Sequence, residues 1–249
     1  MPYPIKSRLW KVRRACIAAA LGILPLPVHS DPAPSFAPVQ PSLSDLDRGA
    51  PTATHLSSAA KKAAEDGIIA MGKDNFAAAE TCFLTLLKLS PDNINGLINL
   101  GLVEFRLGRA EDAQKHLQRA IHLKPDAALA WMTLGVIFMN QHDHEAATAA
   151  LAQAVYLNPK SPQAHNYFAV TLAERGWYSG AEDELEKVIE LAPDFADAHF
   201  NLALLYLQQS PPAVELARRH YQKALALGSR PDPDIAAKLS AAPLQTTIP

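Results

Sequence analysis

Four consecutive residues, His142-Asp143-His144-Glu145, carry side chains that often bind transition metals. Imidazole nitrogens and carboxylate oxygens are ligands for zinc and nickel, so the stretch suggests a metal-responsive site. Adjacent residues in a turn converge on one ion less readily than ligands spaced along a helix, and zinc would need a further ligand from elsewhere. The alternative is a helix start, in which Asp143 caps the helix and Glu145 favours its dipole. We favour the cap and predict no metal site.

Catalytic motifs are missing from the rest of the sequence. There is no phosphate-binding glycine loop, no HExxH, no GxSxG and no pair of closely spaced cysteines. Serine, histidine and acidic residues occur, but nothing in their spacing brings them together. We therefore expect no enzymatic activity, no cofactor and no small-molecule substrate.

The first thirty residues have the layout of a secretory signal peptide. Basic residues from Lys6 to Arg14 precede an apolar stretch, Ala15 to Val28, and Val28-His29-Ser30 fits a small-residue cleavage pattern. The apolar stretch is too short to span a bilayer. We assign residues 1–30 to the signal and expect a periplasmic or secreted protein. An uncleaved signal that anchors the chain in the membrane is the alternative.

The charge of the chain after cleavage bears on its partners. Cleavage after Ser30 leaves 18 basic and 25 acidic residues, a net charge of −7. This charge argues against nucleic acid or an anionic membrane surface as a partner. Cys82 would be the only remaining cysteine, so the mature chain cannot form an internal disulfide and depends on packing.

Residues 31–55 differ in composition from the rest of the chain. They contain five prolines and few large apolar side chains, which is typical of an extended linker that cannot bury enough surface to order itself. From about residue 56 onward the sequence becomes rich in alanine and leucine with helical periodicity. We expect a proline-rich linker over 31–55 and a helical domain after it.

A period of 34 residues organises the helical part of the chain. Pro91, Pro125, Pro159 and Pro193 end similar phrases at that spacing. Each window holds two apolar-periodic stretches of helical length, joined by a short polar or glycine-bearing turn, and the proline ends the second stretch. His142-Asp143-His144-Glu145 falls in one of these turns, and His142 stands where Gly108 and Gly176 stand in other windows. Small residues such as Gly135 mark close helix contacts, where a larger side chain would overpack.

The third window resembles the tetratricopeptide repeat, a family with a 34-residue helix-turn-helix unit. The residues that carry the resemblance are Trp131, Leu134-Gly135, Phe138, Ala147, Leu151, Ala154 and Pro159. The resemblance predicts an array over 56–229 with repeats at about 60–93, 94–127, 128–161, 162–195 and 196–229. The first repeat departs from the pattern at Asp66. The fifth has an insertion at Ser210-Pro211-Pro212, where its second helix is expected to begin. Residues 230–249 are expected to form a short capping helix, Asp232 to Ala242, and a tail.

The resemblance implies an all-α fold, a right-handed α-solenoid whose first helices line a concave groove that binds peptides. By family geometry, the groove residues here are Asn95, Ile98, Asn99, Leu102, Phe105, Met132, Val136, Met139, Asn166, Tyr167, Val170, Phe200, Asn201 and Leu204. The set is apolar with several amides, and it contains no basic residue of the kind that grips a carboxylate. Amides can pair with an extended peptide backbone, and Met and Phe offer adaptable pockets. We therefore predict a scaffold that binds a segment of another protein, in assembly or maturation of a cell-envelope complex.

Several alternatives stay open at this level. The array could self-associate into a structural scaffold, or the groove residues could pack between helices or against the chain's own linker. His165 and His199 occupy one position in successive repeats, so they suggest either packing or a metal- or pH-sensing role. Trp177, in a turn where the family usually has a polar residue, is a candidate exposed contact.

Overall fold

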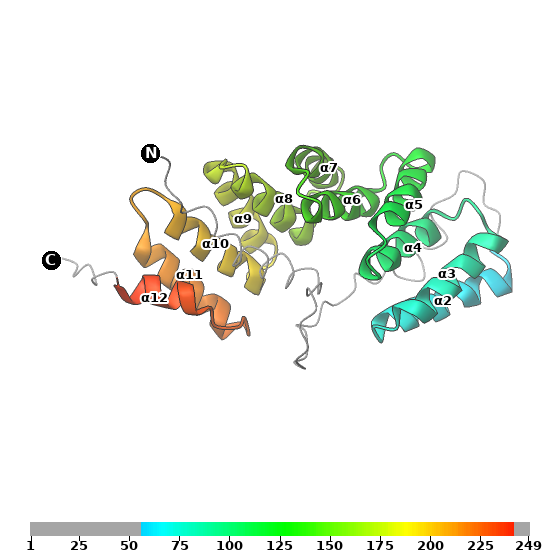
Figure 1. Cartoon of the computed structure of the whole chain (residues 1–249), viewed down its shortest axis with the longest axis horizontal. Coiled ribbons are helices and arrows are strands. Elements are labelled where there is room, and N and C mark those ends of the chain that lie inside the picture. The colour runs from blue at the N-terminus through cyan, green and yellow to red at the C-terminus, as the bar shows by residue number, and fades with distance from the viewer. Residues whose placement is uncertain (1–55, 242–249) are drawn as a thin grey trace. The chain divides into compact units, whose positions relative to one another are not determined.

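The computed structural model describes residues 56–241, and this part of the chain is helical, with no strand. The signal and linker assignments, 1–30 and 31–55, lie outside it. The helices, shown in Figure 1, are α2 (Ser58–Gly72), α3 (Phe76–Leu89), α4 (Ile94–Arg106), α5 (Ala110–Leu123), α6 (Ala128–Asn140), α7 (His144–Leu157), α8 (Pro162–Glu174), α9 (Tyr178–Leu191), α10 (Ala196–Gln208), α11 (Val214–Ala226) and α12 (Pro233–Ala241). None of these helices is both long and apolar enough to cross a membrane.

The helices pair in sequence order, as the repeat period predicts. The chain divides into two compact units, one up to Ala130 and one from Trp131 on, with the boundary inside α6. In the N-terminal unit α2 packs on α3, α4 packs on α5, and α4 also contacts α3. In the C-terminal unit the pairs α8–α9 and α10–α11 follow α7, each first helix also contacting the second helix before it. The expected all-α fold of stacked helix-turn-helix repeats is confirmed.

The prolines of the 34-residue period end the second helices. Helices α3, α5, α7 and α9 each stop two residues before a proline, at Leu89, Leu123, Leu157 and Leu191. The intervening residue leaves the helical conformation, with ψ between 78° and 90°. A residue that precedes proline is sterically disfavoured in the α region, so the sequence itself sets these helix ends.

Within the first three repeats a glycine of the first helix faces a large side chain of the second. Gly67 faces Phe83, Gly101 faces Leu117 and Gly135 faces Leu151. A Cβ atom built on Gly135 would lie 2.5 Å from Leu151 Cγ, too close for two carbon atoms. The glycine is therefore needed for the close approach of the two helices.

We expect Gly135→Ala to lower the free energy of unfolding by about 1–2 kcal/mol, because overpacking outweighs the gain in helix propensity. Gly180→Ala is the matched control, since the nearest side-chain atom to its Cβ, on Leu172, is at 3.5 Å, an ordinary contact. The control should be neutral or slightly stabilising. Denaturant unfolding followed by circular dichroism measures the stability of both variants. Equal stability would show that an alanine at position 135 fits beside Leu151.

The first repeat forms both of its helices although Asp66 departs from the family pattern. Position 10 of the later repeats is buried, as at Val103, Ile137 and Leu205, whereas the equivalent Ile69 is 55% exposed. Lys62 and Asp66 on the same helix are exposed as well. Polar residues at stacking positions are typical of a terminal repeat, whose outer face meets solvent. The departure at Asp66 therefore marks the end of the array within the described residues.

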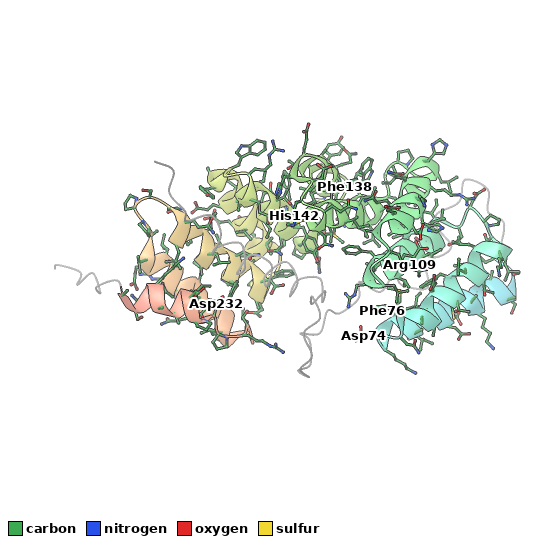
Figure 2. The ribbon with its side chains drawn as sticks, in the orientation of Figure 1. Asp74, Phe76, Arg109, Phe138, His142 and Asp232 are labelled. Carbon is green, nitrogen blue, oxygen red and sulfur yellow. The ribbon has the colours of Figure 1, made fainter. Side chains whose placement is uncertain are left out.

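At the other end, α12 covers α11. Its apolar residues Ile235 and Leu239 join the buried cluster of the C-terminal unit. Asp232, labelled in Figure 2, caps α12, with its Oδ1 accepting hydrogen bonds from the backbone N–H groups of Asp234 and Ile235. The Tyr221 hydroxyl donates to the Asp232 carbonyl and accepts from its N–H, at 3.1 and 2.6 Å. A short closing helix therefore lies where the sequence predicts one.

The insertion in the fifth repeat has a different outcome from the expected one. The sequence predicts that the second helix begins at Pro211-Pro212, but α11 begins at Val214 and both prolines are exposed in the preceding loop. The Ala213 N–H donates to the Tyr206 carbonyl, which ties the loop to the end of α10. The two extra residues are thus absorbed before the helix rather than inside its first turn.

Candidate protein-binding surface

The structure places the predicted groove residues on the first helices α4, α6, α8 and α10, in two groups of different exposure. Seven are buried: Ile98, Asn99, Phe105, Val136, Met139, Asn166 and Tyr167. Seven are partly exposed: Asn95, Leu102, Met132, Val170, Phe200, Asn201 and Leu204. Only the second group has side-chain surface available to a partner, so the accessible patch is smaller than the full set.

Five of the accessible residues belong to the C-terminal unit: Met132 on α6, Val170 on α8, and Phe200, Asn201 and Leu204 on α10. We call these five the first-helix surface. Asn201 Nδ2 donates to Asn166 Oδ1 at 3.0 Å, which links α10 to α8 by an amide pair. Phe200 and Leu204 also pack against the buried cluster beneath them, so their positions are held by the core.

The first helices α6, α8 and α10 carry acidic residues but no basic ones. Helices α6, α8 and α10 contain no lysine or arginine, and their acidic residues are Glu174 and Asp197. Asp197 lies in the first turn of α10, where the helix dipole favours an acid, and burial raises the pKa of its carboxyl. These three helices are therefore apolar to weakly acidic and offer no lysine or arginine side chain.

The four-residue stretch at the α6–α7 turn is a helix start. Asp143 is the N-cap of α7, and its Oδ1 accepts a hydrogen bond from the Ala146 N–H at 3.0 Å. His144 Nδ1 lies 3.2 Å from Glu174 Oε2 on α8. No group of three or more His, Cys, Asp or Glu residues within 56–241 is arranged to hold a metal ion. In this stretch Asp143 therefore caps α7, and His144 contacts the next repeat.

His142 has the backbone conformation of the glycines it replaces. Its φ is +62°, and those of Gly108 and Gly176 in the equivalent turns are +81° and +83°. Asp74, labelled in Figure 2, takes this place in the first repeat. Its φ is +52°, whereas Gly72 is the last residue of α2. Non-glycine residues in this region cost about 1–2 kcal/mol. His142 is therefore tolerated in a left-handed turn position that the repeat geometry imposes.

His165 and His199 each contact the second helix of their own repeat. The Nε2 atoms lie 3.0 Å from the Pro159 and Pro193 carbonyls, six residues earlier in each case. The Nδ1 atoms face Glu184 on α9 and His220 on α11, respectively. Both histidines are buried, as the packing interpretation predicts, but each is also paired with a titratable group.

A third pair of this kind was not expected. The Nδ1 atom of His116 on α5 lies 2.7 Å from Glu104 Oε2 on α4, and the Glu104 side chain is 5% exposed. Burial raises the pKa of Glu104, and the hydrogen bond from His116 lowers it by a smaller amount. The signal in the sequence is the repeat register: His116, Glu184 and, after the two-residue insertion, His220 share one position of the second helix.

Trp177 is half exposed in the turn before α9, as expected for a candidate contact, and the Arg175 guanidinium lies 4.2 Å from its ring centroid. A cation over an indole face is weakly attractive and restrains both side chains. Tyr178, its neighbour, packs against the buried cluster of the C-terminal unit. The two aromatic residues therefore differ, and only Trp177 presents a large exposed ring.

Comparison with known families decides the assignment. A family model described as tetratricopeptide repeat matches residues 66–113 and 98–165, and a second, described as TPR repeat, matches residues 170–210. The chain belongs to the tetratricopeptide repeat family. These matches begin within α2 and end after α10, before α11. No curated protein matches the chain with significance.

Solved structures of the family share the fold. A crystal structure of MamA matches at 26% identity, with a TM-score of 0.56, over 65% of this chain and 93% of that one. MamA from Desulfovibrio magneticus RS-1 matches at 15% identity, a TM-score of 0.59, and 69% and 96% coverage. A thermophilic tetratricopeptide repeat protein of Thermus thermophilus matches at 22% identity, a TM-score of 0.58, and 73% and 97% coverage. Proteins of this family are in general non-enzymatic scaffolds, and the chain is a protein-interaction scaffold.

Proposed function

We propose that the first-helix surface of the C-terminal unit binds an extended segment of a partner protein that carries apolar side chains. The observation behind this proposal is the combination of partly exposed Met132, Val170, Phe200 and Leu204 with the Asn201–Asn166 amide pair. Apolar side chains provide the contact area, and amides can pair with an extended backbone. A prefolded helix array lowers the ordering cost of such binding.

The absence of basic residues on α6, α8 and α10 also limits the charge that the partner segment can carry. A segment rich in acidic groups would meet Asp197 at the start of α10 and no lysine or arginine on these helices. The partner segment is therefore apolar and neutral or basic. The first thirty residues support export, so we propose a role in assembling or maturing a complex of the cell envelope.

The test is capture of the partner by a variant in which the surface carries charge. Met132→Glu with Leu204→Glu introduces two carboxylates where apolar side chains would contact the segment, and desolvating each of them is costly. We expect partner capture from envelope extracts, followed by mass spectrometry, to fall at least tenfold for this variant, while its helicity stays that of the wild type.

Ala149→Glu with Gln222→Glu is the matched control. Both residues are exposed and lie on second helices, α7 and α11, so this variant adds the same charge away from the first-helix surface. It should capture the partner as well as the wild type does. Unaltered capture by the first variant, or equal loss in the control, would place the contact elsewhere, for example at Trp177.

Self-association into a structural scaffold is the alternative. The two ends within the described residues do not favour it, because α2 exposes Lys62 and Asp66 and α12 turns Asp234 and Lys238 to solvent. An end-to-end stack of copies would have to desolvate these charges. A mass that stays that of one chain across a wide concentration range would exclude self-association.

A further inference from the structure

The last complete helix pair, α10 and α11, is joined by two histidines. His199 Nδ1 lies 3.0 Å from His220 Nδ1, and the two rings are stacked with centroids 5.3 Å apart. His199 is 6% exposed and His220 is partly buried. The contact is therefore a hydrogen bond between two imidazoles, largely out of water.

The second nitrogen of His199 determines how the pair shares its protons. A carbonyl only accepts, so His199 Nε2 carries the proton that is donated to the Pro193 carbonyl at 3.0 Å. In neutral His199 the Nδ1 atom is then an acceptor, and His220 Nδ1–H is the donor. One added proton keeps the bond: on His220 Nε2 it leaves the donor unchanged, and on His199 Nδ1 it reverses the bond, with the His220 proton moved from Nδ1 to Nε2. Two added protons put N–H groups on both Nδ1 atoms, and the bond cannot exist.

The groups around the pair do not neutralise a second positive charge. On α9, Glu182 faces His220, and its carboxylate is also hydrogen-bonded by Tyr206 of α10, while Glu186 acts on Tyr206. Gln209 Nε2 donates to Glu182 Oε2 at 3.4 Å. From α12, the contacts to α11 go through Tyr221 and Arg218 instead. A single carboxylate, already shared with Tyr206 and Gln209, thus faces His220.

The preceding repeat contains the same arrangement with the opposite response to acid. His165 donates from Nε2 to the Pro159 carbonyl, as His199 does to that of Pro193, but its Nδ1 faces the Glu184 carboxylate. Nδ1–H can only donate there, so the doubly protonated imidazolium is the form that fits. N–H groups on both ring nitrogens therefore fit the contacts of His165, whereas the same form of both imidazoles breaks the contact between His199 and His220.

We propose that α10 and α11 form a proton-sensitive joint, in which His199 and His220 stay hydrogen-bonded with at most one added proton and separate when both are charged. Separation releases α11, and α12 with it, from α10 in mildly acidic solution. Because Phe200 on α10 packs against Tyr221 on α11, with ring centroids 6.1 Å apart, the joint also supports the first-helix surface. Only the consequence for partner binding rests on the proposed function.

The direction of the pH effect follows from His220. Burial, and secondarily His199, lower the pKa of His220 below its ordinary value of 6.5, and Glu182 opposes this. The unfolded chain then binds protons more readily than the folded one, so stability is complete above that value and falls as the pH drops below it.

Hydrogen exchange of the full chain at pH 7.5 and pH 5.5 tests the joint without any partner. After correction for intrinsic exchange rates, we expect protection of residues 214–241 to fall at least tenfold at the lower pH. His220→Glu reproduces the His165–Glu184 pair, so this variant should keep or raise its protection at pH 5.5. His122→Glu, at an exposed position of α5, should behave as the wild type does.

His220→Gln provides a second variant in case His220→Glu does not fold. A glutamine amide can donate to neutral His199 or accept from charged His199, so the contact should lose its pH dependence. Equal pH dependence in the wild type and in a folded His220 variant would overturn the proposal. Failure of partner capture alone would instead contradict the proposed function and leave the joint standing.

Discussion

Phe83→Ala is expected to lower the free energy of unfolding of the N-terminal unit by about 3–5 kcal/mol, the cost of deleting a buried aromatic side chain. Phe83 is fully buried, and its ring lies over Gly67. The buried residues of α2 are three alanines and this glycine, and its larger apolar side chains Ile68 and Met71 are only partly buried, so the Phe83 ring supplies the largest buried contact of α2. We expect α2 to detach first.

Hydrogen exchange across residues 58–72 and denaturant unfolding measure this effect. Phe83→Leu is the matched control, because Leu117, Leu151 and Leu185 occupy the equivalent position in the next three repeats. Leucine fills much of the volume of the phenylalanine side chain, so Phe83→Leu should lower the free energy of unfolding by only about 1 kcal/mol. If α2 kept wild-type protection in Phe83→Ala, the helix would have to be held by contacts other than the Phe83 ring.

His116→Ala is expected to lower the free energy of unfolding by about 3 kcal/mol at neutral pH, because it leaves the buried Glu104 carboxylate without its hydrogen-bonded partner. Burial already raises the pKa of Glu104, and the loss of His116 removes a contribution that lowers it. A raised carboxyl pKa means that the folded state binds the proton more readily, so the deficit appears as the pH rises above about 4.5. The variant should therefore be closer to the wild type at pH 4.5 than at pH 7.

Glu104→Leu combined with His116→Ala is the decisive comparison. Leucine and alanine are the residues of other repeats at these positions, Leu172 and Ala150, and both are buried there. Replacing both partners of a buried hydrogen bond by apolar residues is often nearly neutral, so the double variant should recover to within about 1 kcal/mol of the wild type. Urea unfolding at both pH values measures this. A double variant as unstable as His116→Ala would show that the orphaned carboxylate is not the cause.

Local features of the repeat could be predicted from the sequence because they depend on near neighbours along the chain. Proline at a constant spacing ends a helix wherever it occurs, so α3, α5, α7 and α9 stop where expected. The sequence also predicts Asp143 as a helix cap, and its hydrogen bond to Ala146 is local. The left-handed turn at His142 follows from its register with Gly108 and Gly176.

The groove was harder to predict, because exposure depends on how neighbouring side chains fill space. Family geometry places Asn99, Tyr167 and Asn201 at one position of the repeat, yet burial differs from repeat to repeat: Asn99 and Tyr167 are buried, whereas Asn201 is partly exposed. The same register position can carry either a contact residue or a packing residue. A period in the sequence does not tell which of the two a given residue is.

The sequence by itself determined the repeat, its helix ends, its turn conformation and the small residues where helices meet, since each of these follows from backbone sterics within one 34-residue unit. Only the tertiary structure decided which side chains face each other across a helix pair. His165 meets a carboxylate and His199 meets another imidazole, because the second-helix position that carries Glu184 in α9 carries His220 in α11. The response of each pair to a proton depends on that partner, 19 or 21 residues away along the chain.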